Sequence, residues 1–153
     1  MKSALTHVYL LPLLFVGTCL GHGHALDARN LTSVDGTRIY AEALGSPSNP
    51  PLLWIHGDSF SGLVFDKQFA DPRLADSYYM VRMDLRGMGR SAKPANESDV
   101  NSWTPDKQAS DVQTVIDGFG LHKPVLLGWS YGSMSTYPRL WYTTDVPPVS
   151  QIL

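Results

Sequence analysis

A three-residue apolar run, Val125-Leu126-Leu127, leads directly into Gly128-Trp129-Ser130-Tyr131-Gly132. Short runs that are apolar on both faces are typical of strands buried between helices. The G-x-S-x-G pattern after such a strand indicates a sharp strand-to-helix turn that exposes its serine above a sheet. Side chains two residues before and after the serine would collide in that turn, which explains a glycine at both places. Ser130 is therefore the candidate nucleophile.

Other strands are predicted earlier in the chain. Leu52–Ile55 is a continuous apolar run that ends at His56-Gly57, and Tyr78–Met83 is a second run that ends at Asp84. Before them, Leu31–Val34 and Thr37–Ala43 flank Asp35-Gly36, a pair that tolerates the positive φ of a tight turn. These two segments predict a β-hairpin.

Helices are predicted between the strands. Thr104-Pro105-Asp106 combines a hydroxyl cap, a proline in the first turn and an acid near the positive end. Apolar residues then recur at helical spacing until Gly120: Ala109, Val112, Val115, Ile116 and Phe119. Asp58–Asp76 indicates an irregular helix with Leu63, Phe65 and Phe69 as possible contacts. The element order predicts an α/β fold with a mostly parallel sheet and flanking helices.

The N-terminal segment 1–25 is expected to be a secretory signal peptide. Lys2 supplies a basic start, and the apolar run from Val8 to Leu20 is too short for a membrane-spanning helix. Gly23-His24-Ala25 is an acceptable cleavage site, so cleavage is expected after Ala25 and the mature protein is expected to be secreted. The alternative is a buried N-terminal strand or helix.

Two sequons agree with secretion. Asn30-Leu31-Thr32 and Asn96-Glu97-Ser98 are candidate glycosylation acceptors in a eukaryotic host. His22 and His24 resemble a metal-binding pair, but they lie in the segment expected to be removed, so no metal site is predicted.

Composition excludes several classes of protein. The chain has 153 residues, 12 basic and 14 acidic side chains and one cysteine. A net charge of −2 argues against the basic surface that nucleic-acid binding needs, and a single cysteine cannot form an internal disulfide. The hydrophobic content of 43% is that of a globular domain.

Three segments together resemble the α/β-hydrolase superfamily, in the branch that has a His-Gly oxyanion loop and a serine nucleophile elbow. They are LLWIHGD at 52–58, MDLRGMGRSAKP at 83–94 and LLGWSYG at 126–132. The middle segment matches the family's D-x-R-G-x-G-x-S loop, and the resemblance covers roughly residues 31–134. It implies the α/β-hydrolase fold, with Leu52–Ile55 and Tyr78–Met83 as the third and fourth strands.

The resemblance also implies roles for residues. Ser130 would attack an ester or related acyl group, and the backbone N–H groups of Asp58 and Tyr131 would stabilise the oxyanion. His56 and Gly57 would support the oxyanion loop, and Gly128 and Gly132 the elbow. A serine nucleophile argues against the epoxide hydrolase and haloalkane dehalogenase branches, which have aspartate there.

Other motifs in the chain are given structural interpretations. The cluster of Asp84, Arg86, Gly87, Gly89 and Ser91 favours a tight loop held by Asp–Arg contacts. Gly118-x-Gly120 precedes a strand and lacks a third glycine, so it does not indicate a dinucleotide site.

The sequence lacks an evident general base. A hydrolase of this fold uses its triad in the chain order Ser, Asp or Glu, His, yet no histidine follows Ser130. His122 precedes the nucleophile's strand and would lie roughly 25 Å from Ser130, at about 3.3 Å per residue. Asp145 precedes the place where a sixth strand would begin and receives no role. We therefore expect a partial domain over 26–153, truncated after the nucleophile elbow, without strands 6–8, the lid, the acid and the histidine.

The last residues depart from the family pattern. Pro138 and Pro147-Pro148 interrupt the helix expected after Gly132, so 135–153 is interpreted as an atypical tail and the family-like sequence ends near Met134. Two functions stay open: an esterase-like serine hydrolase, inactive as this chain, and a non-catalytic secreted fragment or ligand-binding pseudoenzyme. No metal or organic cofactor, no nucleic acid and no stable membrane span are expected. A small-molecule acyl substrate is expected, and oligomeric state is not predicted.

Overall fold

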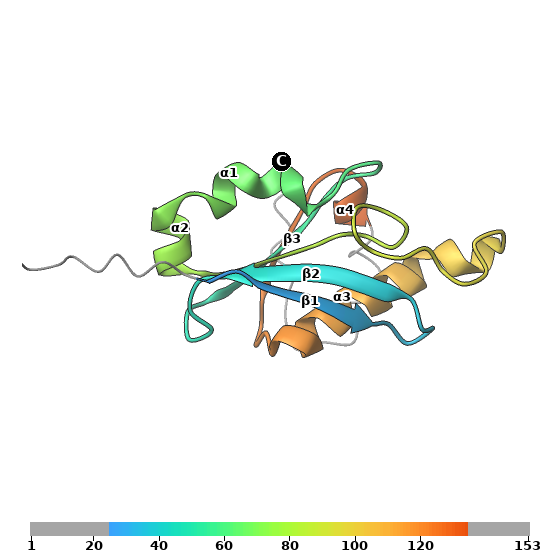
Figure 1. The fold of residues 1–153 in the computed structure, drawn as a ribbon, viewed down its shortest axis with the longest axis horizontal. Coiled ribbons are helices and arrows are strands. Elements are labelled where there is room, and N and C mark those ends of the chain that lie inside the picture. The colour runs from blue at the N-terminus through green and yellow to red at the C-terminus, as the bar shows by residue number, and fades with distance from the viewer. Residues whose placement is uncertain (1–24, 135–153) are drawn as a thin grey trace, which may run out of the picture.

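The computed structural model describes residues 25–134, which form one sheet with helices on both of its faces (Figure 1). The expected signal peptide, apart from Ala25, and the atypical tail at 135–153 lie outside the described residues. Within residues 25–134, no helix is long and apolar enough to cross a bilayer.

The hairpin predicted from Asp35-Gly36 is present. Strand β1 (Asp27–Thr32) pairs antiparallel with β2 (Arg38–Leu44), with Thr32 opposite Arg38. Gly36 has a φ of 83°, and the turn is closed by a bond of 2.9 Å from its N–H to the Ser33 carbonyl. The glycine is required there because this φ is unfavourable for residues with a Cβ.

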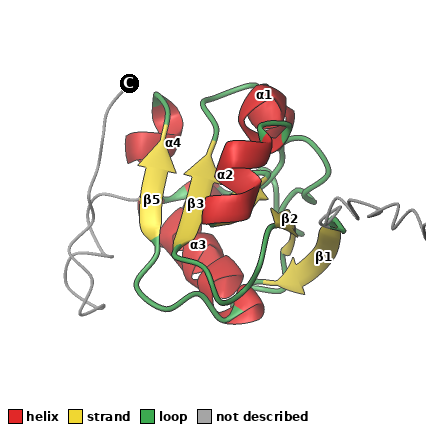
Figure 2. Ribbon diagram, turned by 90° about the vertical axis from the view of Figure 1, so that its left-hand side faces the viewer, coloured by secondary structure: helices red, strands yellow, loops and turns green. Residues whose placement is uncertain are grey.

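The sheet has the order β1-β2-β4-β3-β5. Strand β3 (Pro51–Ile55) lies parallel to both β4 (Tyr79–Met83) and β5 (Val125–Gly128), whereas β2 is antiparallel to β4. The sheet is thus mixed, because the hairpin adds two antiparallel pairings to the parallel part. Figure 2 shows β3 and β5 pointing the same way, so the loops that follow these two strands emerge at the same end of the sheet.

Helix α3 (Pro105–Phe119) covers one face of the sheet. The Thr104 hydroxyl accepts a hydrogen bond from Lys107 N–H, and Gly120 ends the helix with a φ of 63°. Its predicted apolar stripe is buried, and all of the stripe except Ala109 belongs to the larger core cluster, together with residues of β2, β3, β4 and β5. The helix and its boundaries are therefore as predicted.

Three short helices cover the opposite face: η1 (Gly62–Phe65), α1 (Asp66–Phe69) and α2 (Pro72–Ser77). Phe65 and Phe69 are buried there against Leu52 and Met80, as predicted. Leu63 is a predicted possible contact, but the residue is 51% exposed. The prediction was wrong for Leu63 because the chain forms a 3-10 helix at this point, whose period turns Leu63 outward.

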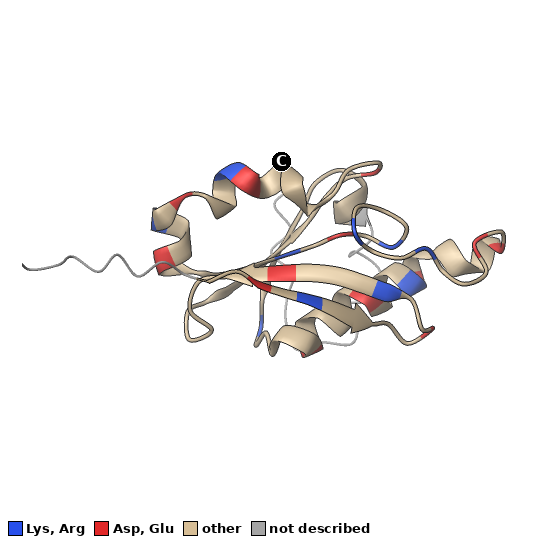
Figure 3. Cartoon of the chain, in the orientation of Figure 1, with Lys and Arg blue, Asp and Glu red and all other residues tan. Residues whose placement is uncertain are grey.

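Two further short helices complete the described chain. Helix η2 (Val100–Trp103) precedes α3, and α4 (Tyr131–Met134) follows β5. Acidic and basic residues are interspersed along the strands, helices and loops (Figure 3).

Candidate active site

Strand β5 ends in a sharp turn that carries Ser130. Its φ is 53°, in the left-handed region that residues with a side chain rarely adopt, and the residue is exposed. Such a conformation costs on the order of 1–3 kcal/mol and persists only where the surroundings hold it. Three backbone bonds hold it here: Trp129 N–H donates to the Ile55 carbonyl at 3.0 Å, Gly132 N–H to the Trp129 carbonyl at 2.9 Å, and Ser133 N–H to the Ser130 carbonyl at 2.9 Å.

The two glycines of the elbow lie where no side chain fits. A Cβ at Gly128 would lie 2.7 Å from Ser133 Cα, and one at Gly132 would lie 2.5 Å from the His56 carbonyl oxygen. Both contacts are with backbone atoms, which cannot move aside as a flexible side chain can. The turn thus needs glycine on both sides of Ser130, for the steric reason inferred from the sequence.

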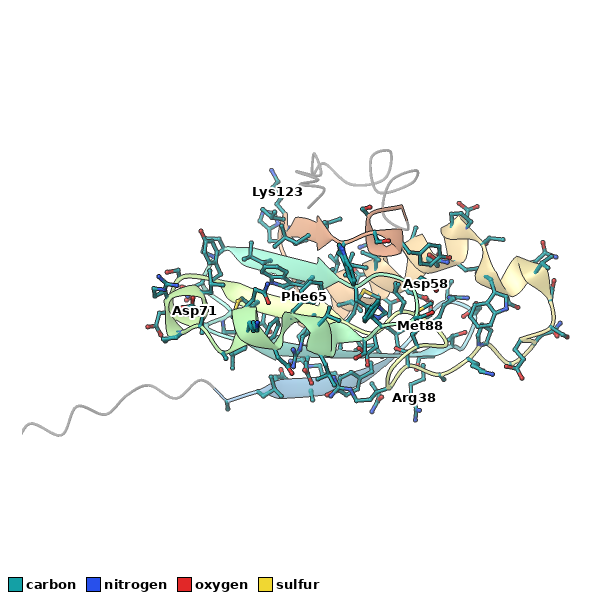
Figure 4. All side chains as sticks on the ribbon, turned by 90° about the horizontal axis from the view of Figure 1, so that it is seen from above. Arg38, Asp58, Phe65, Asp71, Met88 and Lys123 are labelled. Carbon is teal, nitrogen blue, oxygen red and sulfur yellow. The ribbon has the colours of Figure 1, made fainter. Side chains whose placement is uncertain are left out.

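The loop after β3 lies directly against the elbow. A Cβ at Gly57 would lie 3.2 Å from Ser130 Cβ and 3.2 Å from Trp129 Cε3. The structure therefore brings together the two motifs that the sequence separates by more than 70 residues. Figure 4 shows Asp58 and Met88 at the end of the sheet toward which β3 and β5 point, and Lys123 at the opposite end.

His56 is fully buried beneath this loop and holds it. Leu85 N–H donates to His56 Nε2 at 3.0 Å, so Nε2 accepts and the proton of the neutral ring lies on Nδ1. Nδ1 lies 2.6 Å from the Gly57 carbonyl oxygen and donates to it. Burial lowers the pKa of His56 below its usual value, which favours this neutral form.

This contact sets the direction of the Asp58 amide. In a trans peptide the N–H points opposite to the C=O of the same unit, and residues 25–134 contain no cis peptide bond. Because His56 fixes the Gly57 carbonyl, it also fixes the Asp58 N–H, for which the described residues provide no acceptor. The carboxylate of Asp58 is exposed and accepts from Ser59 Oγ at 3.2 Å.

Tyr131 is held from the side of α3. Its hydroxyl accepts a hydrogen bond from Gln108 Nε2, which is itself buried. Because Tyr131 is the first residue of α4, this contact connects the elbow to the helix on the core face of the sheet.

Asp84 anchors the far end of the same loop. Its buried carboxylate accepts Gly62 N–H at 2.6 Å through Oδ1 and Arg90 N–H at 2.8 Å through Oδ2. Together with the bond from Leu85 to His56, this fastens both ends of the segment 56–62 to the chain after β4. The segment that carries Asp58 is therefore held from two sides.

The cluster of Asp84, Arg86, Gly87, Gly89 and Ser91 has the structural role that we expected, but its ion pairs differ from a simple Asp84–Arg86 contact. Asp84 pairs with Arg90, whereas Arg86 reaches Asp111 in α3 and Asp35 in the hairpin turn. The Arg86 guanidinium donates to Asp111 with two bonds of 2.7 Å and also reaches the Ser102 and Lys107 carbonyls. All five of its N–H groups thus have acceptors, as a buried charge requires.

The pKa values of Asp35 and Asp111 shift in opposite directions, although Arg86 acts to lower both. Although partial burial acts to raise its pKa, hydrogen bonds from Thr37 and Arg86 lower the pKa of Asp35 to about 2. Complete burial raises the pKa of Asp111 above its usual value, and Arg86 opposes this only in part. The sequence gives no sign of Asp111, which lies on the buried side of a helix among apolar residues.

A second buried pair lies on the other face of the sheet. Glu42 is 1% exposed and accepts from Arg82 Nε at 2.6 Å, and Arg82 also reaches Asp66 at 2.6 Å. Burial acts to raise the pKa of Glu42, but hydrogen bonds from Tyr40 and Arg82 hold it below its usual value. This pair ties β2 and β4 to α1, and hydropathy alternation alone could not reveal it.

An apolar cavity of about 290 Å³ lies beside the elbow. Its lining includes Trp54, Phe65 and Leu127, and two of its polar atoms, Trp54 Nε1 and Gln68 Oε1, are buried without a hydrogen-bond partner among the described residues. Nearby, the Phe60 and Trp129 rings pack at 5.0 Å between centroids and are both partly exposed. No motif in the sequence marks this apolar surface.

The described residues contain two histidines, and neither is placed to act as a base for Ser130. Both nitrogens of His56 are engaged with backbone groups. His122 is exposed and precedes β5, at the end of the strand opposite to Ser130. Within residues 25–134, no three His, Cys, Asp or Glu side chains gather as metal ligands would.

Comparison with known proteins identifies the fold. The sequence profile described as "alpha/beta hydrolase fold" matches residues 50–136. A methylesterase for rhodomycin D from Streptomyces peucetius is 28% identical over 108 residues, which is 71% of this chain and 35% of the relative. Epoxide hydrolase 4 of Mus musculus is 30% identical over 65% of this chain and 26% of its own length.

A solved structure agrees with these matches. The putative aryl esterase from Burkholderia cenocepacia superposes with a TM-score of 0.65 and 37% identity, over 71% of this chain and 39% of that protein. The chain thus spans less than half the length of these relatives. It belongs to the alpha/beta hydrolase fold family and represents the N-terminal part of that fold.

Proposed function

We propose that this alpha/beta hydrolase chain is part of a serine hydrolase that acts on an ester or related acyl group through an acyl-enzyme. The observation that carries the proposal is the left-handed Ser130 at the end of β5, with the Gly57 loop packed against its side chain. Related proteins include a methylesterase and a putative aryl esterase. A serine at the elbow favours acyl transfer over the epoxide opening of other relatives.

The proposed chemistry follows from this arrangement. Ser130 Oγ attacks the acyl carbonyl carbon and its proton passes to a general base, which produces a tetrahedral oxyanion. The N–H groups of Asp58 and Tyr131 would stabilise that negative charge. Collapse of the intermediate breaks the bond to the leaving oxygen, which takes the proton from the base and departs as the alcohol, and leaves an ester on Ser130. Water then hydrolyses this ester to a carboxylic acid and restores the Ser130 hydroxyl.

His56 has a supporting role in this proposal. Its ring directs the Gly57 carbonyl away from the reacting atoms and so presents the Asp58 N–H to them. The general base and its acid partner are proposed to lie outside residues 25–134, because His56 is engaged and His122 lies beyond the far end of β5.

The same observation favours a second candidate, which is a chain that binds ligands at the preformed oxyanion site without turnover. A serine without a base stays protonated at neutral pH and is a poor nucleophile. In a studied serine protease, loss of the histidine alone lowers turnover by on the order of 10⁶.

Covalent labelling separates the two candidates. The 153-residue chain is incubated with a fluorophosphonate probe, alongside Ser130→Ala and Ser48→Ala, which removes an exposed hydroxyl elsewhere. Labelling that Ser130→Ala abolishes and Ser48→Ala preserves supports the hydrolase. A folded, soluble chain that takes up no probe supports the binding protein and contradicts catalysis by this chain.

We also propose that the mature protein is secreted after cleavage following Ala25. The support is the basic start, short apolar run and small-residue cleavage site of the sequence. N-terminal sequencing of protein recovered from culture medium tests this: a mature chain that begins at Leu26 supports it, and retention of Met1 contradicts it.

A further inference from the structure

The sequon at Asn96 occupies an exposed turn between β4 and η2. Asn96, Glu97 and Ser98 are all exposed, and Asp99 N–H donates to the Asn96 carbonyl at 3.2 Å. A sequon that serves as a glycan acceptor is expected in such a surface loop. This exposure leaves space for a large, hydrated group.

The side chains of this sequon are in direct contact. Ser98 Oγ donates to Asn96 Oδ1 at 3.1 Å, which leaves the amide nitrogen Nδ2 without a hydrogen-bond partner among the described residues. The turn itself is tied down at its centre: Lys93 pairs with Glu97 at 2.7 Å, and Trp103 Nε1 donates to the Glu97 carbonyl at 2.9 Å. The acceptor nitrogen is therefore presented outward on a fixed turn.

The second sequon has a different conformation. Asn30 and Thr32 lie within strand β1, opposite Tyr40 and Arg38 of β2, and Leu31 between them packs against the core. Within the described residues, the Thr32 hydroxyl and the Asn30 amide make no hydrogen bond with each other, in contrast to Ser98 and Asn96. For Asn30 to adopt a turn like that at Asn96, β1 would have to bend and give up hydrogen bonds to β2.

We propose that Asn96, and not Asn30, carries an N-linked glycan when the chain passes through a eukaryotic secretory pathway. The inference rests on the proposed secretion and is independent of the proposed catalysis. The donor is a lipid-diphosphate-linked oligosaccharide supplied by the host. Asn96 Nδ2 forms a bond to the anomeric carbon of the first sugar and loses one proton. The bond from that carbon to the diphosphate breaks, and the lipid diphosphate leaves with its electron pair.

The test uses the 153-residue chain with its own N-terminus, expressed in insect cells. Protein from the lumen and the medium is digested with a peptide N-glycosidase, and the gel mobility and the mass of each tryptic peptide are compared before and after. The variants Asn96→Gln and Ser98→Ala both destroy this sequon, the first at the acceptor asparagine and the second at the hydroxyl residue. Asn30→Gln removes the other sequon, and Asn101→Gln changes an exposed asparagine nearby that is not in a sequon.

The expected result is one glycan, lost in Asn96→Gln and Ser98→Ala and retained in Asn30→Gln and Asn101→Gln. A glycan that depends on Asn30, or a lumenal chain that carries none, overturns the proposal. Secretion is checked by adding protease to microsomes from the same cells, because a chain inside the lumen is protected. A chain that the protease digests lies outside the lumen, and this result overturns the secretion and the glycosylation together. Neither result bears on the labelling of Ser130, so failure of this proposal and failure of the hydrolase proposal are distinguishable.

Discussion

The two sides of the candidate site are built differently. Two buried hydrogen bonds fasten the loop 56–62 to the residues that follow β4. Leu85 N–H donates to His56 at one end of the loop, and Gly62 N–H at the other end donates to Asp84. Ser130 follows β5, which pairs only with β3 within residues 25–134 and lies beside partly exposed aromatic rings. The loop 56–62 therefore takes its position from a buried polar network, whereas Ser130 takes its position from a strained turn after the edge strand β5.

The largest expected effect comes from breaking the buried ion pair of Arg86 and Asp111, which joins the segment after β4 to α3. Arg86→Met leaves the fully buried Asp111 carboxylate without its partner, so we expect the free energy of unfolding to fall by about 3–5 kcal/mol in urea denaturation. Replacing both charges, as Arg86→Met with Asp111→Leu, should recover part of the loss.

The control is the exposed pair Arg73–Asp71. Arg73→Ala should leave the urea midpoint unchanged, because exposed ion pairs contribute little. If Arg86→Met were no more destabilising than Arg73→Ala, the buried Arg86–Asp111 pair would not contribute to the stability of the fold.

The next effect concerns the elbow itself. Gly132→Ala would drive a Cβ into the Ile55 and His56 carbonyl oxygens, and we expect a loss of about 1–3 kcal/mol in thermal unfolding. Gly62→Ala is the matched change in the anchored loop, where the nearest atoms are the Asp84 and Arg82 side chains at 3.2 and 3.3 Å. Because side chains can shift and backbone carbonyls cannot, Gly62→Ala should cost less. The reverse order would contradict the steric account of the elbow.

The pH dependence of stability tests His56. Burial lowers its pKa in the folded state, so the unfolded chain binds the proton more tightly and stability should fall as the pH drops below about 6.5. One such group changes the free energy of unfolding by at most about 1.4 kcal/mol per pH unit. The slope between pH 7 and 5.5 should flatten in His56→Gln and persist in His122→Gln, whose ring is exposed. An unchanged slope in His56→Gln would show that another group is responsible.

The smallest effect comes from two tryptophans. Trp103 Nε1 donates to the Glu97 carbonyl at 2.9 Å, whereas Trp54 Nε1 is buried without a partner among the described residues. Trp103→Phe should therefore lose about 0.5–1.5 kcal/mol with its hydrogen bond, while Trp54→Phe should be close to neutral. Urea titrations of both variants measure the difference. An equal loss in both would mean that ring volume, and not the hydrogen bond, sets the cost.

Much of the fold could be predicted from local pattern. The hairpin around Gly36, the apolar strands and the stripe of α3 follow from turn chemistry and hydrophobic period, which act between near neighbours in the chain. The exception, Leu63, lies in a 3-10 helix whose period differs from that of an α-helix.

The candidate site was predicted only in part. The elbow and the His-Gly loop are motifs, so the sequence pointed to Ser130, Gly57 and Asp58. Glu42 and Asp111 gave no such signal, because a charged residue is normally placed at the surface unless its partner is known. Their partners Arg82 and Arg86 lie 40 and 25 residues away in the chain.

By itself, the sequence determined which segments form strands and helices and which serine stands in a sharp turn, since these depend on sterics and periodicity within a few residues. The tertiary structure decided that Gly57 packs against Ser130, that His56 donates to one carbonyl while accepting from Leu85, and that Arg86 joins the hairpin to α3. Such contacts depend on the pairing of groups distant in the chain. Burial strongly favours that pairing, because a charge or polar atom removed from water without a partner costs free energy.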